Sequence, residues 1–230
     1  MSKPWFCAVA AFALCGSGAF GAALAATPAG IVEEVSGDVG GVEAMDYLME
    51  GQRLHLGVGA YLVASFFAPC AREKIVGGDV VITGGRSVVS GGTVERSPVD
   101  CDPGRMILTP SQSEQAAGVV ERGMKEKTAR LELAPSVQLI VYGSSPLVIV
   151  HGDAPPILER VGGDRKREAL PAKRDRDRWI YDFAPEGRSL APGALYRLIA
   201  GSRLVVFRVD GDAQPGATPI AGRLILLSAE

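Results

Sequence analysis

Apolar residues in this sequence recur in short runs, and many runs alternate with polar residues at a period of two, which is typical of β-strands. In the first half, residues 29–39 begin apolar and end in a Ser-Gly-Asp turn signal. Residues 47–66 place Leu54 and Leu56 on one face, and glycines punctuate the run. This pattern predicts several strands between about residue 30 and residue 103.

Three Gly-Gly doublets stand seven residues apart in the stretch IVGGDVVITGGRSVVSGGTVERSPVDC, at Gly77-Gly78, Gly84-Gly85 and Gly91-Gly92. Glycine every seven residues excludes a coiled coil, which needs helix-forming residues with an apolar heptad. A phosphate-binding loop needs one glycine-rich turn followed by a helix, and no helix pattern or Gly-Lys-Ser/Thr follows. We therefore predict short strands, DVVI, RSVV and TVER, that are joined by tight turns at the doublets.

The second half repeats the strand pattern from about residue 131 to residue 230. Residues 137–150 give two apolar stretches around a Gly-Ser-Ser-Pro break, and residues 194–211 predict a hairpin around Gly201-Ser202. Residues 221–228 form a final apolar run. Six or seven short strands at this spacing predict a β-sandwich. Between the halves, residues 104–130 are polar and flanked by proline, as in a linker, and residues 112–127 fit either a short helix or a strand.

The N-terminus predicts export. Lys3 precedes a compact apolar run, and Ala23-Leu24-Ala25 is an A-x-A cleavage pattern, so residues 1–25 fit a secretory signal peptide. A retained membrane anchor and a lipidated Cys15 are the alternatives. We expect a periplasmic or secreted protein of the cell envelope, with no transmembrane span after cleavage.

Two of the four cysteines, Cys70 and Cys101, lie outside the predicted signal peptide. An even pair in an oxidising compartment predicts one disulfide. In the chain-entropy treatment, closing a loop of this length stabilises the fold by roughly 3–4 kcal/mol. The disulfide would join the two ends of the glycine-rich segment.

Composition narrows the chemistry. The formal net charge of −2 gives no general attraction to nucleic acid. With only two histidines, His55 and His151, a histidine-based metal site is not expected, and no cofactor is predicted. Ser144, Ser145, His151 and Asp153 stand close in sequence, but they flank one predicted strand and no G-x-S-x-G motif occurs. Trp179, Tyr181 and Phe183 alternate on one strand face, as a core stripe or a sugar-stacking platform.

The most basic stretch runs from residue 160 to residue 179, and we call it the arginine stretch. It fits a solvated hairpin loop, or a patch that binds an anionic lipid or polysaccharide of the envelope. The candidate patch consists of Arg165, Lys166, Arg167, Lys173, Arg174, Arg176 and Arg178.

Residues 30–103 resemble the FecR-like domain family. The matching positions are Gly37-Asp38-Val39, Leu48-x-x-Gly51-x-x-Leu54, Leu56-Gly57-x-Gly59-Ala60-x-Leu62 and Gly78-x-Val80-x-Ile82. The resemblance implies an extracytoplasmic β domain. Named members of that family relay iron-uptake signals to a cytoplasmic sigma factor. This chain departs from them because it shows no cytoplasmic N-terminal domain pattern and because the cysteine pair lies outside the common pattern.

Residues 131–230 resemble immunoglobulin-like or fibronectin type III sandwiches. The match is Leu190-Ala191-Pro192-Gly193-Ala194-Leu195-Tyr196, the L-x-P-G-x-x-Y corner of those folds. The resemblance implies that the Tyr196 hydroxyl bonds to nearby backbone, with Leu190 and Gly193 shaping the corner.

The sequence therefore predicts an all-β, non-enzymatic envelope protein, with a FecR-like β roll or meander followed by an immunoglobulin-like sandwich. We expect it to act in binding or scaffolding on an envelope protein or an anionic envelope polymer or lipid. A membrane-anchored anti-sigma-type relay and a cell-envelope hydrolase are the alternatives.

Overall fold

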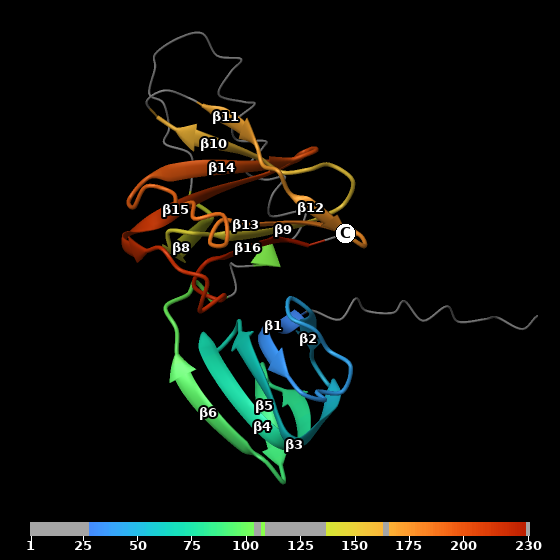
Figure 1. Cartoon of the computed structure of the whole chain (residues 1–230). Helices are drawn as coiled ribbons and strands as arrows, with labels where there is room; N and C mark the ends of the chain where they lie inside the picture. The colour runs from blue at the N-terminus through green and yellow to red at the C-terminus, as the bar shows by residue number, and fades with distance from the viewer. Residues whose placement is uncertain (1–27, 104–106, 109–136, 163–165, 229–230) are drawn as a thin grey trace, which may run out of the picture.

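The computed structural model describes residues 28–103, 107–108, 137–162 and 166–228. These residues form strands, turns and irregular segments, and none of them is helical. Their strands make three sheets in two units, with the second unit stacked on the first (Figure 1). The all-β class that the alternating pattern predicts is therefore confirmed.

The first unit is one antiparallel sheet in the order β2-β1-β3-β4-β5, with β6 also paired to β4. Its two longest strands, β3 and β4, both continue through glycines. The strands of this sheet are β1 (Pro28–Ser36), β2 (Tyr47–Met49), β3 (Arg53–Phe66), β4 (Ala71–Thr83), β5 (Arg86–Ser90) and β6 (Thr93–Pro98).

The three glycine doublets belong to one hairpin, residues 71–98, which we call the glycine hairpin. Gly84-Gly85 forms its tip, with φ values of 62° and 72° and Thr83 paired to Arg86. Positive φ at both central residues is the type I′ geometry that suits the twist of a hairpin. At this doublet, the predicted tight turn is confirmed.

The prediction of turns at the other two doublets is wrong. Strand β4 runs without a break through Gly77-Gly78, and β5 and β6 keep one register against it, from Asp79 opposite Ser90 to Val76 opposite Thr93. The outer doublets are equally distant from the tip, so Gly77-Gly78 and Gly91-Gly92 face each other. The spacing of seven therefore places glycine against glycine across the hairpin.

The facing glycines let two backbones come closer than side chains would allow. A Cβ atom on Gly78 would lie 2.6 Å from the Gly92 nitrogen, and one on Gly92 would lie 2.7 Å from the Val76 carbonyl oxygen. At the same level, the register of β3 against β4 shifts between Leu56 and Tyr61, which marks a bulge. We infer that the sheet bends sharply here, because bulges and glycine relieve the pleat where a sheet must curve.

The bend carries the start of the hairpin close to its tip. Glu73, on β4, accepts hydrogen bonds from Ser87 on β5 and from Arg96 Nε at 2.7 Å. Its side chain is 1% exposed. A buried carboxylate is tolerated only when charged or polar partners satisfy it, so this cluster holds the rolled sheet closed over its apolar core.

The second unit has two sheets, in the orders β11-β10-β14-β15-β8 and β12-β13-β9-β16-β7. The predicted hairpin around Gly201-Ser202 is confirmed, because Ala200 pairs with Arg203. The strands are β7 (Ile107–Leu108), β8 (Leu139–Gly143), β9 (Leu147–His151), β10 (Ile157–Val161), β11 (Arg167–Ala169), β12 (Lys173–Asp175), β13 (Arg178–Asp182), β14 (Leu195–Ala200), β15 (Arg203–Gln214) and β16 (Leu224–Leu227).

Two expectations about element boundaries need correction. Residues 107–108 were expected in the linker, yet β7 pairs in parallel with β16 and so belongs to the second unit. The arginine stretch was expected to be a hairpin loop, yet it contributes to β10, β11, β12 and β13. Its two edge strands, β11 and β12, carry charged side chains because an edge strand can expose both faces, so their sequences show no apolar alternation. The rest of the predicted linker, including residues 112–127, lies outside the described residues, as do residues 1–25.

One apolar core fills the second unit and extends into the first. The space between the two sheets is packed by fully buried side chains such as Leu147, Phe183 and Phe207. Ile31 and Phe67 of the first unit belong to the same cluster. The remaining first-unit core, around Leu62 and Ile75, is a separate cluster. Apolar packing is therefore continuous from one unit to the other.

Candidate functional site

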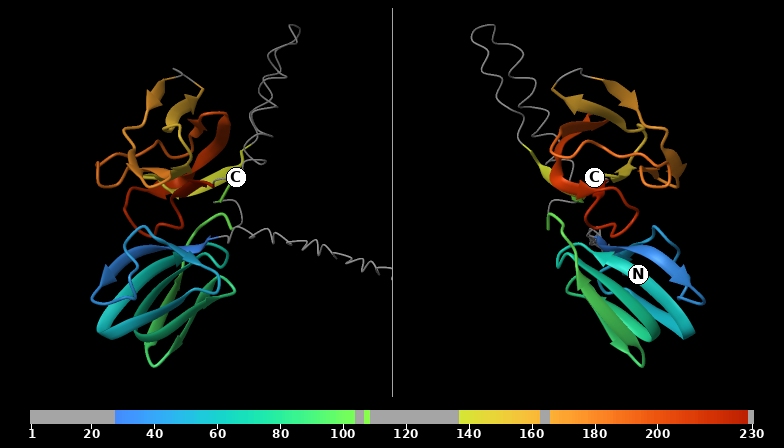
Figure 2. Two further views of the ribbon diagram at one scale, coloured as in Figure 1. Left: turned by 90° about the vertical axis from the view of Figure 1, so that its right-hand side faces the viewer. Right: turned by 60° about the vertical axis from the view of Figure 1, so that its left-hand side comes forward.

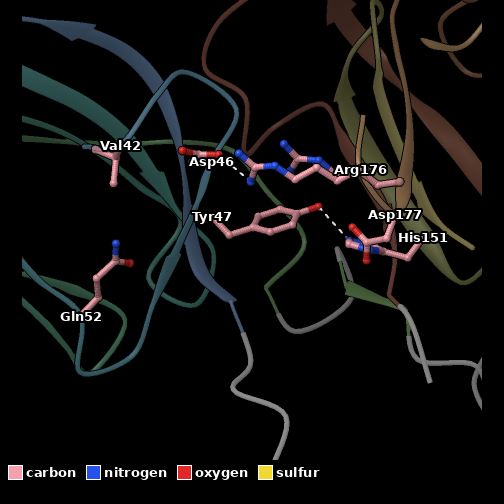
Figure 3. Close-up of a pocket in the computed structure, with 8 residues that line it drawn as sticks. Val42, Asp46, Tyr47, Gln52, His151, Arg176 and Asp177 are labelled. Carbon is pink, nitrogen blue, oxygen red and sulfur yellow. Dashed lines mark hydrogen bonds and ion pairs between the residues drawn. The ribbon is translucent and has the colours of Figure 1, made fainter. Parts of the chain in front are cut away.

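A pocket lies at the junction of the two units, and we call it the junction pocket (Figure 3). Its volume is about 280 Å³. The first unit contributes β2 and the turns beside it, and the second unit contributes the end of β9 and the turn between β12 and β13. The lining residues are Val42, Asp46, Tyr47, Gln52, His151, Arg176, Asp177 and Arg178.

Three polar side chains form a chain across the junction. Asp177 Oδ2 lies 3.0 Å from His151 Nδ1, and His151 Nε2 lies 3.4 Å from the Tyr47 hydroxyl. With the ring proton on Nδ1, His151 donates to Asp177 and accepts from Tyr47. The Tyr47 and His151 rings are 5.9 Å apart between centroids. Figure 3 shows the hydroxyl of Tyr47 pointing from the first unit to His151 on the second.

Protonation states in this chain follow from burial and hydrogen bonding. Burial raises the pKa of Tyr47 to about 12, so its hydroxyl stays protonated at neutral pH. The hydrogen bond from His151 lowers the pKa of Asp177, so that carboxyl group is ionised. Tyr47 is therefore a hydrogen-bond donor and a poor nucleophile, because the reactive tyrosinate is scarce.

Arg178 is the buried cation of the junction, with a side chain that is 8% exposed. Asp175 holds it through Nε at 3.1 Å and Nη2 at 2.9 Å, and Nη1 donates to the Met45 carbonyl at 3.0 Å. Its guanidinium lies 5.1 Å from the centroid of the Tyr47 ring. Burial disfavours the charge of Arg178, but its hydrogen bonds to Asp175 and Tyr47 outweigh burial and raise its pKa.

Backbone strain is found on both sides of the pocket. Arg176 has a φ of 56° and Met45 a φ of 72°, in the left-handed region that non-glycine residues rarely adopt. Arg176 and Asp177 form the two-residue turn between β12 and β13, where glycine is the usual choice. Such strain persists only where tertiary contacts impose it, and it is commonest at functional sites.

A second contact between the units surrounds Glu33 of β1, whose side chain is 1% exposed. Its carboxylate accepts hydrogen bonds from Arg72 Nε at 2.7 Å and from the Ile220 amide at 2.6 Å. Ser65 donates to the same carboxylate and accepts from the Ala221 amide at 3.2 Å. The loop between β15 and β16 is therefore fixed to the first unit, and it lies between the units in both views of Figure 2.

The predicted disulfide between Cys70 and Cys101 is confirmed, with Cα atoms 5.7 Å apart. It closes the open end of the glycine hairpin, where the Val99 amide donates to the Cys70 carbonyl at 2.8 Å. Cys101 is buried in the core that spans the two units. The disulfide therefore stabilises the hairpin and the junction together.

At the residues of the predicted tyrosine corner, the Tyr196 hydroxyl accepts a hydrogen bond from the Ala191 amide at 3.0 Å. Leu190 is buried and Gly193 has a φ of 74°. Tyr196 also stacks on Phe207, with ring centroids 5.6 Å apart. The hydroxyl thus bonds to backbone five residues upstream, at the start of β14.

The candidate anion patch is not one free basic surface. Each of its described arginines is paired with a carboxylate: Arg167 with Glu159, Arg174 with Asp153, Arg178 with Asp175 and, across the junction, Arg176 with Asp46. Arg178 is buried and therefore cannot contact a polymer at the surface. Lys166 and Lys173 are exposed, and Arg165 lies outside the described residues.

The serine–histidine candidate is not assembled. Ser144 and Ser145 are buried just before β9, and Ser145 Oγ donates to the Arg188 carbonyl at 2.8 Å. His151 ends the same strand and turns to Tyr47 and Asp177 instead. In the aromatic stripe, Tyr181 and Phe183 are core residues in edge-to-face contact, with centroids 4.8 Å apart.

Sequence reasoning named His151, Arg176 and Arg178, but it did not connect them with Tyr47 or Asp177. Tyr47 and His151 are 104 residues apart, and no local motif joins them. The strained turn at Arg176 also has no signature, because it lacks the usual glycine. Within the described residues, no cluster of histidine, cysteine and carboxylate side chains could hold a metal ion.

Fold and site together define an all-β, disulfide-bonded protein of two units that meet around a polar pocket. In comparisons with known proteins, no family model, curated protein or solved structure matches the chain. The described part of the chain contains no helix with the length and apolar character needed to cross a bilayer.

Proposed function

We propose that this chain is an exported, non-enzymatic protein of the cell envelope that acts in binding or scaffolding. Its first unit would be a FecR-like domain and its second an immunoglobulin-like sandwich. The partner would be an envelope protein or an envelope polymer. A disulfide supports export, since such bonds persist in oxidising compartments.

The observation that carries the proposal is the junction. Two buried charged groups, Glu33 and Arg178, each bond across the boundary between the units, and one apolar core continues through it. Separate domains linked only by chain would need no such contacts. A fixed arrangement presents one continuous surface and a preformed pocket, which lowers the entropic cost of binding.

The chemistry of the junction pocket also fits binding better than catalysis. Tyr47 keeps its proton, and Arg178 is tied to Asp175 and to the Met45 carbonyl. His151 is occupied on both ring nitrogens. None of these groups is a free base or nucleophile, whereas the Tyr47 hydroxyl can donate to a ligand that replaces its 3.4 Å contact with His151.

The test combines location with capture. The tagged full chain is expressed in a Gram-negative host, the cells are fractionated, and thiols are alkylated without reductant before mass spectrometry. We expect the protein in the envelope fraction, with the N-terminus of the mature chain near Ala26. Neither Cys70 nor Cys101 should be alkylated. Crosslinking in the intact envelope should then capture a specific protein or glycan.

A reduced cytosolic protein would contradict the proposal. A retained N-terminal segment would instead favour the anti-sigma-type relay. Turnover of an envelope polymer by the purified protein would favour the hydrolase.

A further inference from the structure

The geometry points to the junction pocket as a site for one uncharged monosaccharide ring, presented by an envelope glycan. This inference rests on the proposed function and names the ligand class of that site. Four features of the described residues support it. Each unit forms one wall of the pocket and carries polar groups that are held in place, and the contacts between the two walls are long. The lining combines hydrogen-bond donors with acceptors, and the volume of the pocket fits one sugar ring.

The polar groups on each wall are held in place from behind. On the second unit, Asp177 fixes His151 at 3.0 Å and Asp175 fixes Arg178 at 2.9 Å. On the first unit, the Met49 amide donates to Gln52 Oε1 at 2.9 Å and so orients the amide group of that side chain. Groups whose positions are set in advance bind a ligand with little loss of side-chain entropy.

The side-chain contacts that cross the pocket are longer. Tyr47 and His151 are 3.4 Å apart, and Arg176 Nη1 lies 3.8 Å from Asp46 Oδ1. Both contacts are drawn in Figure 3, and both join one wall to the other. Both distances exceed the roughly 2.7–3.2 Å of a normal hydrogen bond, so both contacts are weak. A hydroxyl group entering the pocket can therefore replace these contacts at small cost.

The lining has equal numbers of opposite charges and mixes donors with acceptors. Tyr47, Gln52 and Arg176 offer donors, and Asp46 and Asp177 offer carboxylate acceptors. The lining contains two aspartates and two arginines. An anion would therefore be repelled by the carboxylates, and a cation by the guanidinium groups. Sugar hydroxyls both donate and accept without charge, and neighbouring hydroxyls match the paired atoms of a carboxylate or guanidinium.

The pocket of about 280 Å³ lies just below the roughly 300–1,000 Å³ that ligand sites usually span. It suits one ring better than an oligosaccharide or a peptide segment. Val42 and the ring of Tyr47 provide apolar surface for the carbon face of the sugar. The strained backbone at Arg176 and Met45 is consistent with walls shaped for a ligand.

The experiment is an NMR titration of the purified, oxidised protein with glucose, galactose and N-acetylglucosamine in the millimolar range. Glycine and sodium phosphate serve as zwitterionic and anionic comparators. We expect saturable shifts of pocket resonances with at least one sugar and no saturable shifts with glycine or phosphate.

The variants Tyr47→Phe and Asp177→Asn should each weaken sugar binding by roughly 3–10-fold, since each loses a hydrogen bond to the ligand. Asp79→Asn is the matched control: Asp79 pairs with His55 at 2.7 Å on an exposed face of the first unit, and its loss should leave binding unchanged. An unchanged backbone spectrum verifies the fold of each variant.

No shift with any sugar, tighter binding of glycine or phosphate, or equal sugar binding by all three variants would overturn this inference. The proposed function is tested separately, by location and capture. Sugar titrations that fail for an oxidised protein captured with an envelope partner reject only the sugar site. A reduced cytosolic protein rejects the function itself.

Discussion

The two units enclose their apolar cores in different ways. The first bends a single sheet on itself, and it depends on glycine contacts, a disulfide and the buried carboxylate Glu73. The second stacks two sheets over a larger apolar core, which also holds the buried ion pair between Arg223 and Asp182. The stability of the first unit therefore depends mainly on backbone geometry, whereas that of the second depends mainly on side-chain packing. Each of the following variants separates these two kinds of dependence.

The largest effect should come from the buried ion pair of the second unit. Arg223 donates to Asp182 at 2.7 Å and 3.0 Å and to the carbonyls of Ala217 and Ser145. Removing it by Arg223→Ala leaves Asp182 and two carbonyls without their donor, at a cost of about 3–5 kcal/mol in the free energy of unfolding. Urea denaturation measures this loss. Arg174→Ala, which breaks the exposed pair with Asp153, is the control and should cost less than about 1 kcal/mol.

The disulfide should have the next largest effect, and that effect should begin in the first unit. Its cysteines are 31 residues apart, so Cys70→Ala/Cys101→Ala should lower the free energy of unfolding by about 3–4 kcal/mol. Hydrogen exchange should show faster opening of β4 and β6 than of β9 and β16. Uniform acceleration of exchange in both units would mean that they unfold as one cooperative body.

The glycine contacts can be tested with two neighbouring residues. Gly92→Ala places a Cβ atom against the backbone of Val76 and Gly77, and should destabilise by about 3 kcal/mol. Gly91→Ala meets nothing within 4 Å and carries only the strain of a φ of 71°, roughly 1 kcal/mol. Thermal unfolding gives both values. Equal losses would show that close backbone approach is not what requires glycine at Gly92.

The smallest effect is a pH dependence at the junction. The pKa of Tyr47 is raised from 10.0 to about 12, so the folded state holds this proton more tightly than the unfolded state. The resulting stabilisation is fully present below pH 10 and is lost as pH rises toward about 12. Tyr47→Phe should remove this part of the alkaline decline, which urea denaturation across that pH range measures. Tyrosinate absorbance of the wild type minus the variant should show one group that titrates near pH 12.

Alternation along the chain was enough to predict the all-β class, the hairpin around Gly201-Ser202 and the final strand at β16. These features depend on local periodicity and on turn residues, which a sequence displays directly. The disulfide was also predictable, because only two cysteines lie outside the signal-peptide pattern. Strands β11 and β12 within the arginine stretch were missed, because these charged edge strands have no apolar alternation.

The role of the three glycine doublets could not be predicted from the local sequence alone. Glycine permits a turn, but it equally permits two backbones to touch, and the sequence alone does not distinguish these uses. Once Gly84-Gly85 is known to be the tip, the seven-residue spacing places Gly78 beside Gly91 and Gly92. That knowledge comes from pairing, which is a property of the folded sheet.

The amino-acid sequence by itself determined the strand content, the cysteine pair and the residues able to carry charge. Only the tertiary structure decided which charges became buried partners and which polar groups surround the pocket. Tyr47 meets His151 across 104 residues, and Glu33 meets Ile220 across 187. Such contacts depend on how the surfaces of the two units pack together. Docking is governed by complementary shape and desolvation over many residues, which no local pattern encodes.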